Sequence, residues 1–204
     1  EYQEEIKGSD WEDAYLFYQE NGYIPPSMYW TTNESWQGDY VPDGVNVVYA
    51  SSTLVDKRGR YNYEVKNIGD EDLRTVWVEG ESDYGVGEYI VLEHNFDSGG
   101  LLFYNGFQKT IDLWKNNSRV KTFKVYLNNV PLCFLELEDI MGAQQFSFGD
   151  VNDIGFIDEE FFEHFDGKHN KEDKYLIRLE IYEVYKGKKW KDVCVTDILY
   201  TYKT

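Results

Sequence analysis

Basic residues and long apolar runs are both scarce in this sequence of 204 residues. It carries 20 Lys and Arg against 38 Asp and Glu, which gives a formal net charge of −18. So acidic a chain is repelled by phosphate backbones, and this argues against nucleic acid as a partner. No apolar run approaches the roughly 20 residues that span a bilayer, so we expect no direct insertion into a membrane.

Cysteine is almost absent from the sequence. The two that are present, Cys133 and Cys194, could form a disulfide in an oxidising compartment. Each lies in an alternating apolar run, VPLCFLEL and DVCVTDI, where a buried free thiol is the more common outcome. We therefore expect two buried thiols and keep the disulfide as the alternative.

Recognisable catalytic signatures are also lacking. There is no Gly-x-Ser-x-Gly elbow, and no Cys is paired with a His in a nucleophile motif. The three histidines, His94, His164 and His169, match no metal-binding helix spacing. Acidic pairs are inevitable among 38 carboxylates and do not by themselves indicate a glycosidase. We predict a non-catalytic protein that requires no cofactor, with a two-carboxylate enzyme acting on glycans as an alternative.

Aromatic residues are plentiful, at 18% of the chain with 18 tyrosines. They supply enough area for one core and leave rings at the surface, where Tyr and Trp suit contact with sugar or protein. The chain begins at Glu1 with the polar segment EYQEEIKGSD. Such a start is typical of a mature exported chain, so we expect a secreted, periplasmic or cell-surface protein and leave a lipid anchor open.

The sequence divides into an N-terminal arm, residues 1–44, and one main domain, residues 45–204. In the arm, residues 9–22 have rings at helical spacing before a Gly, which predicts one amphipathic helix. The rest of the arm is rich in turn formers and large rings, and we expect it to pack irregularly against the main domain.

The main domain consists of short β-type runs separated by turn signals. This pattern predicts an all-β antiparallel sandwich or jelly roll. LNNVPL reads as a hairpin turn, and residues 150–173 as a partly helical insertion between two strands. The predicted strands are 45–50, 88–94, 101–105, 119–128, 130–139, 144–149, 175–187 and 192–202.

Two glycines one residue apart, in Gly85-Val86-Gly87, suggest a nucleotide loop at first sight. A dinucleotide fingerprint needs a strand before it and a helix after it, whereas here a strand, EYIVLEH, follows. We interpret the glycines as a bend that leads into this strand.

Six short motifs follow one another through the main domain in an order found in one protein family. They are SSTL, NIGDEDLRTVWVEG, GVGEYI, YNGFQKT, LWKNNSRVK and EVYKGKKWKDVCVTDI. Over residues 45–204 the sequence resembles the discoidin-like, glycan-binding translocation domain attached to secreted bacterial NAD glycohydrolases. That domain is a relative of the coagulation-factor type C and galactose-binding-like sandwiches.

The resemblance implies an eight-stranded jelly roll whose loops at one end bind glycan without catalysis. The sequence departs from the family pattern at Phe107 and Thr110, where Tyr and Ser are expected, and in the insertion and the arm. We do not expect this chain to have the activity of the NAD glycohydrolases to which the family domain is attached.

The resemblance also implies a cation site. Asp70, Asp72 and Thr75 offer oxygens in a turn-rich loop, and Trp77 closes one end of the barrel. Asp197 occupies the position from which related modules send an acidic residue back to this loop, so the four residues form a candidate Ca²⁺ site of structural kind. A role in stabilising turns is the alternative for these acids.

Amide, cationic and aromatic side chains in the same motifs form the candidate sugar site. The amides and cations can satisfy vicinal hydroxyls or a sialic carboxylate, and the rings offer a stacking face. The alternative gives the asparagines ordinary turn roles and pairs Arg119 with a surface acid. The candidate residues are Glu79, Tyr84, Asn105, Phe107, Lys109, Asn116, Asn117 and Arg119.

We therefore predict a non-catalytic carbohydrate-binding module with a glycan or glycoconjugate as partner. The alternative function is a protein-interaction or assembly module. In that case the aromatic arm, with Trp30, Trp36 and Tyr40, docks a protein partner and the sandwich serves as scaffold.

Overall fold

The computed structural model describes residues 29–31, 40–93, 100–127, 129–147 and 176–203. The predicted helix at 9–22, the insertion at 150–173, Trp36 and the three histidines lie outside these described residues. In the described part, no helix is long and apolar enough to cross a membrane.

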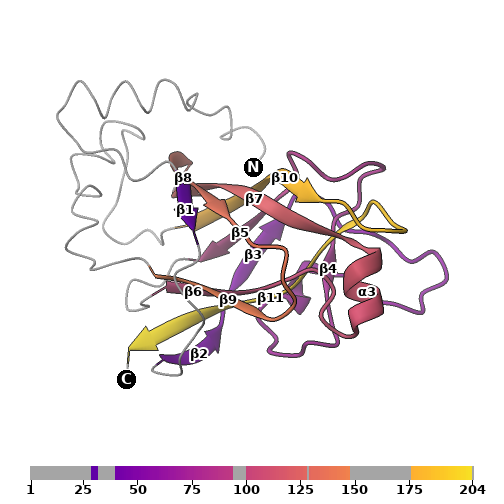
Figure 1. Cartoon of the computed structure of the whole chain (residues 1–204), viewed down its shortest axis with the longest axis horizontal. Coiled ribbons are helices and arrows are strands. Elements are labelled where there is room, and N and C mark those ends of the chain that lie inside the picture. Colours follow the sequence, from indigo (N-terminus) through magenta and orange to yellow (C-terminus); the bar gives the residue numbers. More distant parts are fainter. Residues whose placement is uncertain (1–28, 32–39, 94–99, 128, 148–175, 204) are drawn as a thin grey trace.

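The described chain is a discoidin-like β-sandwich, as the sequence predicts. Its strands form one continuous hydrogen-bonded sheet that folds into two layers (Figure 1). The strands are β1 (Tyr29–Thr31), β2 (Tyr40–Gly44), β3 (Val47–Ala50), β4 (Trp77–Val78), β5 (Tyr89–Glu93), β6 (Gly100–Asn105), β7 (Ser118–Leu127), β8 (Val130–Glu136), β9 (Ala143–Ser147), β10 (Leu176–Tyr185) and β11 (Val193–Lys203). The helices are η1 (Val65–Asn67), a single 3-10 turn, and α3 (Ile111–Asn116).

One layer runs in the order β3-β5-β10-β7-β8, and the other is built on β11 with β6 and β9 at its side. The layers join where the start of β7 runs parallel to the start of β11, at Ser118 with Val193 and Arg119 with Cys194. Nearly all other pairings are antiparallel. The junction matters for the site, because it brings the beginnings of two distant strands together at one end.

The core lies between the two layers. Phe103 of β6 packs on Phe123 of β7 with ring centroids 6.1 Å apart and on Phe146 of β9 at 5.4 Å. Trp77 is fully buried in the same core, and its indole N–H donates to the carbonyl of Ser52 at 3.1 Å. The predicted burial of this ring is confirmed.

Both cysteines are buried free thiols, as expected from their apolar runs. Burial raises the pKa of the Cys133 thiol to about 12, so it stays protonated at any physiological pH. The hairpin in LNNVPL is also confirmed, because β7 and β8 pair antiparallel from Leu127 with Val130. Asn129 sits there at φ 67°, a left-handed conformation that Asn tolerates.

Part of the N-terminal arm belongs to the sheet rather than packing irregularly on it. β1 pairs in parallel with β8, and β2 pairs antiparallel with β11 from Gly44 with Leu199 to Tyr40 with Lys203. The sequence did not reveal these strands, because they are short and set among turn-forming residues. Their backbone bonds come from partners far along the chain, which local patterning does not report.

Candidate functional site

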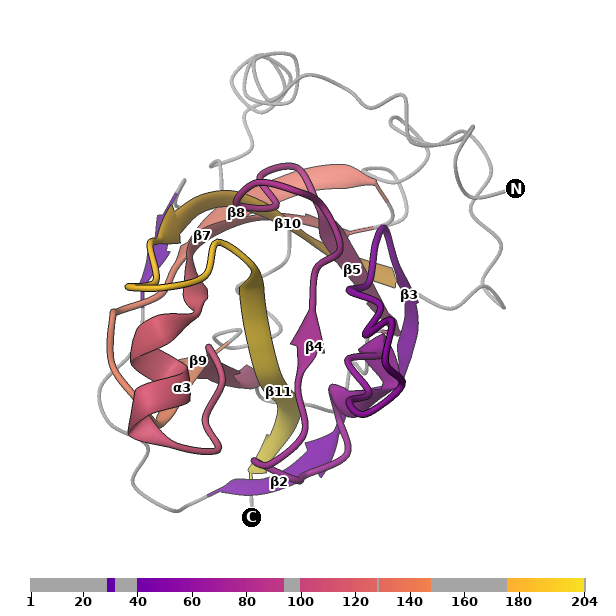
Figure 2. The ribbon, with the colours of Figure 1, turned by 90° about the vertical axis from the view of Figure 1, so that its right-hand side faces the viewer.

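Five connecting segments meet at one end of the sandwich, which we call the loop end. It faces the viewer in Figure 2, where α3, β4 and the start of β11 surround it. The segments follow or precede strands that all start or stop there, and the motifs of the sequence analysis fall mainly on them. They are residues 51–64, 79–88, 106–117, 137–142 and 186–192.

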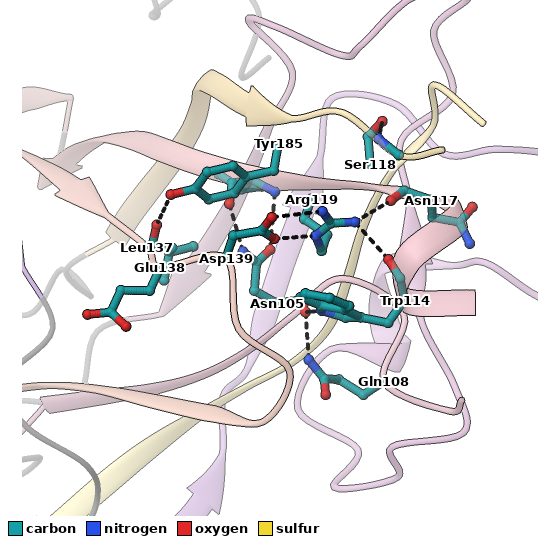
Figure 3. Close-up of polar contacts among 12 residues, drawn as sticks. Asn105, Gln108, Trp114, Asn117, Ser118, Arg119, Leu137, Glu138, Asp139 and Tyr185 are labelled. Atoms are coloured by element: carbon teal, nitrogen blue, oxygen red, sulfur yellow. Dashed lines mark hydrogen bonds and ion pairs between the residues drawn. The ribbon is translucent and has the colours of Figure 1, made fainter. Parts of the chain in front are cut away.

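Arg119 organises the middle of the loop end (Figure 3). Its guanidinium donates to both carboxylate oxygens of Asp139, at 2.7 and 3.2 Å, and to the carbonyls of Trp114 and Asn117, both at 2.8 Å. It also lies over the Trp114 ring, 4.3 Å from the centroid. Because Trp114 and Asn117 belong to the C-terminal end of α3, Arg119 fastens this helix to β7 and to the segment after β8.

Asn105, at the end of β6, makes a second set of internal bonds. Its side chain donates to the carbonyl of Val120 at 2.7 Å and accepts from the Val120 N–H at 3.1 Å. Its own carbonyl accepts from the Gln108 amide and from the Trp114 indole. The side chain therefore acts as a bridge between β6 and β7 and is fully engaged within the protein.

The structure thus gives three of the predicted sugar ligands internal partners. Asn105, Asn117 and Arg119 are all buried, and Asn117 donates through its side chain to the carbonyl of Leu113. Arg119 pairs with an acid, as the alternative interpretation proposed, although its own guanidinium is buried and not at the surface. These residues support the shape of the loop end and do not face solvent.

Glu79 is also buried, just after β4. Its carboxylate accepts the N–H of Glu81 at 2.7 Å and the N–H of Val193 at 3.1 Å, and so ties the 79–88 segment to the start of β11. Burial raises the pKa of Glu79 to about 7, although these two hydrogen bonds stabilise the charged form and act in the opposite direction.

The glycine pair forms the bend that the sequence predicts. Gly85 has φ 60°, and a Cβ there would lie 2.6 Å from Cγ of Glu79, so the segment folds closely over the buried carboxyl group. Gly87 also has a positive φ, and β5 begins two residues later. The bend therefore serves to hold Glu79 and to start the strand.

The other four candidate sugar residues lie nearer the surface. Lys109 is exposed, whereas Tyr84, Phe107 and Asn116 are half-buried. Phe107 packs against the small cluster of Val76, Val78 and Cys194. Tyr84 and Asn116 both lie beside the 186–192 segment.

The candidate cation residues are split between a surface turn and the core. Asp70 accepts the Thr75 hydroxyl through both carboxylate oxygens, at 3.0 and 2.8 Å. Asp72 forms an exposed pair with Arg74, whose guanidinium holds the pKa of Asp72 at about 2. These contacts correspond to the turn-stabilising role, which was the alternative prediction for these acids.

Asp197 lies fully buried in β11, close to this turn. Its Oδ1 accepts the N–H of Gly69 at 2.6 Å and of Ile198 at 2.9 Å, while Oδ2 has no hydrogen-bond partner among the described residues. Burial raises the pKa of Asp197 to about 6. The orphaned oxygen suits a cation, yet no three acidic, His or Cys residues of the described chain gather into a metal-binding group. Ca²⁺ therefore stays a prediction.

One feature of the loop end is not among the predicted site residues. The motif EVYKGKKWKDV places four lysines and Trp190 in the β10–β11 connection. The sequence signal for it is a run of basic residues in an acidic chain.

Several solved structures share this fold at very low sequence identity. The CBM32-1 and CBM32-2 domains of ZmpB from Clostridium perfringens match with a TM-score of 0.54 and 9% identity, over 95% of this chain and 51% of theirs. The same domains in complex with GalNAc match with a TM-score of 0.54 and 9% identity, over 94% and 49%. A longer ZmpB structure that includes the M60 catalytic domain matches with a TM-score of 0.51 and 8% identity, over 89% of this chain and 17% of that structure. The chain thus spans about half, or less, of these neighbours.

No curated protein matches the chain. A family model does, over residues 39–201, which include β2 to β10, most of β11 and nearly all of the main domain. The match agrees with the motifs and with the sandwich fold of the structural neighbours. The chain belongs to the NAD glycohydrolase translocation F5/8 type C domain family.

Proposed function

We propose that this chain is a non-catalytic carbohydrate-binding module that works outside the cytoplasm. Its family is described as an NAD glycohydrolase translocation F5/8 type C domain, and its fold neighbours include CBM32 domains, two of them solved in complex with GalNAc. Fold and family alone do not establish a ligand, since one fold hosts many functions. The side chains of the loop end decide whether this chain can hold a ligand.

The observation that carries the proposal is the construction of the loop end. Buried polar residues, with Arg119 and Asn105 at the centre, fix the connecting segments to a rigid sandwich. Tyr84, Lys109 and Asn116 then stand on these fixed segments with surface left for contact. Exposed polar and aromatic side chains on a rigid scaffold are the common form of a binding surface.

The test is a glycan-array screen of the full chain beside a Tyr84→Ala, Lys109→Ala double variant. We expect selective binding by the native chain and a loss of about tenfold or more in the variant, because a stacking ring and a charged donor are removed together. The matched control is Tyr182→Ala, which removes an exposed ring from the middle of β10. Absence of binding across the array, or equal loss in the control, would contradict the proposal.

A further inference from the structure

The β10–β11 connection reverses the charge of the chain. Residues 186–191 contain four of the 20 basic residues and no acid, in a protein of net charge −18. In sequence they are bracketed by Glu183, which pairs with Lys121, and by Asp192. We call residues 186–191 the lysine loop. It is a small positive segment in an acidic chain.

Among the described residues, the four ammonium groups of the lysine loop have no ion-pair partner. Lys186, Lys188, Lys189 and Lys191 are exposed, and within the described ranges none of them has a carboxylate within 4.0 Å. Uncompensated like charges repel one another. An anion that approaches such a cluster is therefore attracted to it, and its binding relieves the repulsion among the lysines.

Aromatic rings are interleaved with these charges. The ammonium groups of Lys186 and Lys191 lie 4.9 and 5.6 Å from the centroid of the Tyr84 ring, and that of Lys189 lies 4.4 Å from the Trp190 ring. Trp190 is 37% exposed. Rings of this kind can stack on the C–H face of a sugar while neighbouring cations bind an acidic substituent.

The lysine loop is held in place before any ligand arrives. The N–H of Lys188 donates to the carbonyl of Lys115 at 3.0 Å, and those of Lys189 and Trp190 donate to the carbonyl of Asn116 at 3.1 and 2.9 Å. These carbonyls are at the C-terminal end of α3, where they have no partner inside the helix.

A second anchor comes from β7. The Ser118 hydroxyl accepts the N–H of Gly187 at 3.0 Å and donates to the carbonyl of Trp190 at 3.1 Å. The backbone of the loop is therefore fixed at both ends of its turn. A fixed backbone reduces the ordering entropy that binding would otherwise cost.

We propose that the lysine loop with Tyr84 is a subsite for the acidic group of a glycan, the carboxylate or sulfate of one charged sugar residue. This inference rests on the proposed function and narrows its ligand class. A bilayer or a polyphosphate presents an extended anionic surface, which the rest of this acidic chain repels. A single charged sugar needs to meet only the lysine loop, and neighbouring rings suit its apolar face.

The experiment compares matched glycan pairs that differ only in the acidic group: 3′-sialyllactose with lactose, and sulfated with unsulfated N-acetyllactosamine. The full chain is tested beside one triple variant, the lysine-loop variant, which carries Lys186→Gln, Lys189→Gln and Lys191→Gln. The control triple variant is Lys57→Gln, Lys66→Gln, Arg74→Gln, which removes the same charge from exposed positions in 51–76. Melting temperatures confirm that both variants fold.

We expect the native chain and the control to prefer one acidic member by about tenfold or more, and the lysine-loop variant to lose that preference. Added salt should weaken the preference. Binding to neutral and acidic members alike would overturn the subsite and leave the proposed function standing. Absence of all glycan binding would contradict both the subsite and the proposed function. Equal loss in the two variants, or binding to phosphatidylserine vesicles with no glycan bound, would also overturn the subsite.

Discussion

Arg119 shows how one buried cation can shape a surface that it does not reach. Its guanidinium satisfies two carbonyls at the end of α3 and is balanced by Asp139. Asn116 lies between Trp114 and Asn117 in sequence, and its backbone carbonyl accepts hydrogen bonds from two N–H groups of the lysine loop. A buried charge is tolerated when it is paired and hydrogen-bonded, and here Arg119 pairs with Asp139 and uses four of its five N–H donors.

Glu79 should make stability depend on pH. Because burial raises its pKa from 4.5 to about 7, the folded protein holds a proton that the unfolded chain releases between those values. Its contribution is therefore complete below pH 4.5 and is lost as the pH rises to about 7, with a slope of up to about 1.4 kcal/mol per pH unit. Asp197, with its pKa raised from 3.8 to about 6, acts in the same direction.

The measurement is chemical denaturation of the native chain and of Glu79→Gln across pH 4.5 to 7.5. The variant should show a smaller decline in the free energy of unfolding over this window, since Gln does not titrate. Asp83→Asn, an exposed neighbour in the same segment, is the control. A variant that declines as steeply as the native chain would mean that Glu79 is ionised in the folded protein throughout.

At the scale of elements, α3 is the platform of the loop end. Thr110 caps its first turn by accepting the N–H of Leu113, so the departure from the expected Ser keeps the hydroxyl that the cap needs. The other end of the helix carries no glycine cap and relies on Arg119 and the lysine loop to satisfy its carbonyls. A helix of six residues has little stability by itself, and these contacts hold it.

Gly187→Ala tests whether the lysine loop docks as described. A Cβ at this position would lie 2.4 Å from the carbonyl oxygen of Asn116, which is backbone and cannot swing away. The alanine should lower the free energy of unfolding by about 1–3 kcal/mol, as overpacking does elsewhere. Thermal and urea denaturation measure the loss, with Lys188→Ala in the same loop as control. Equal stability of the two variants would show that the loop is not packed on α3.

At the scale of the whole molecule, the predicted Ca²⁺ site can be tested through stability. If it binds near Asp197 in the folded state, added Ca²⁺ raises the melting temperature and chelation lowers it, by about 2–4 °C for each kcal/mol of binding linkage. Asp197→Asn should remove the difference, because it neutralises the orphaned Oδ2 while the amide oxygen can still accept from Gly69. A melting temperature that is the same with Ca²⁺ and with chelator would end the cation prediction.

The strands were predictable because each is a local pattern. All eight expected runs contain a strand, and the largest boundary difference is at 130–139, where β8 ends at Glu136. The local pattern did not predict four of the elements: the two strands of the arm, the two-residue strand β4 and the six-residue helix α3. These are short elements whose hydrogen bonds or packing depend on distant partners.

The sequence by itself determined the class of this protein: a sandwich with buried thiols, a buried Trp77 and the motifs of one family. Periodicity and motif order carry that information along the chain. Only the tertiary structure decided which motif residues are structural, because Glu79, Asn105 and Arg119 look like ligands until their buried partners are seen. It also placed the lysine loop beside Tyr84, about a hundred residues away in sequence, because the antiparallel pairing of β5 with β10 brings the segment before β5 and the segment after β10 to the same end.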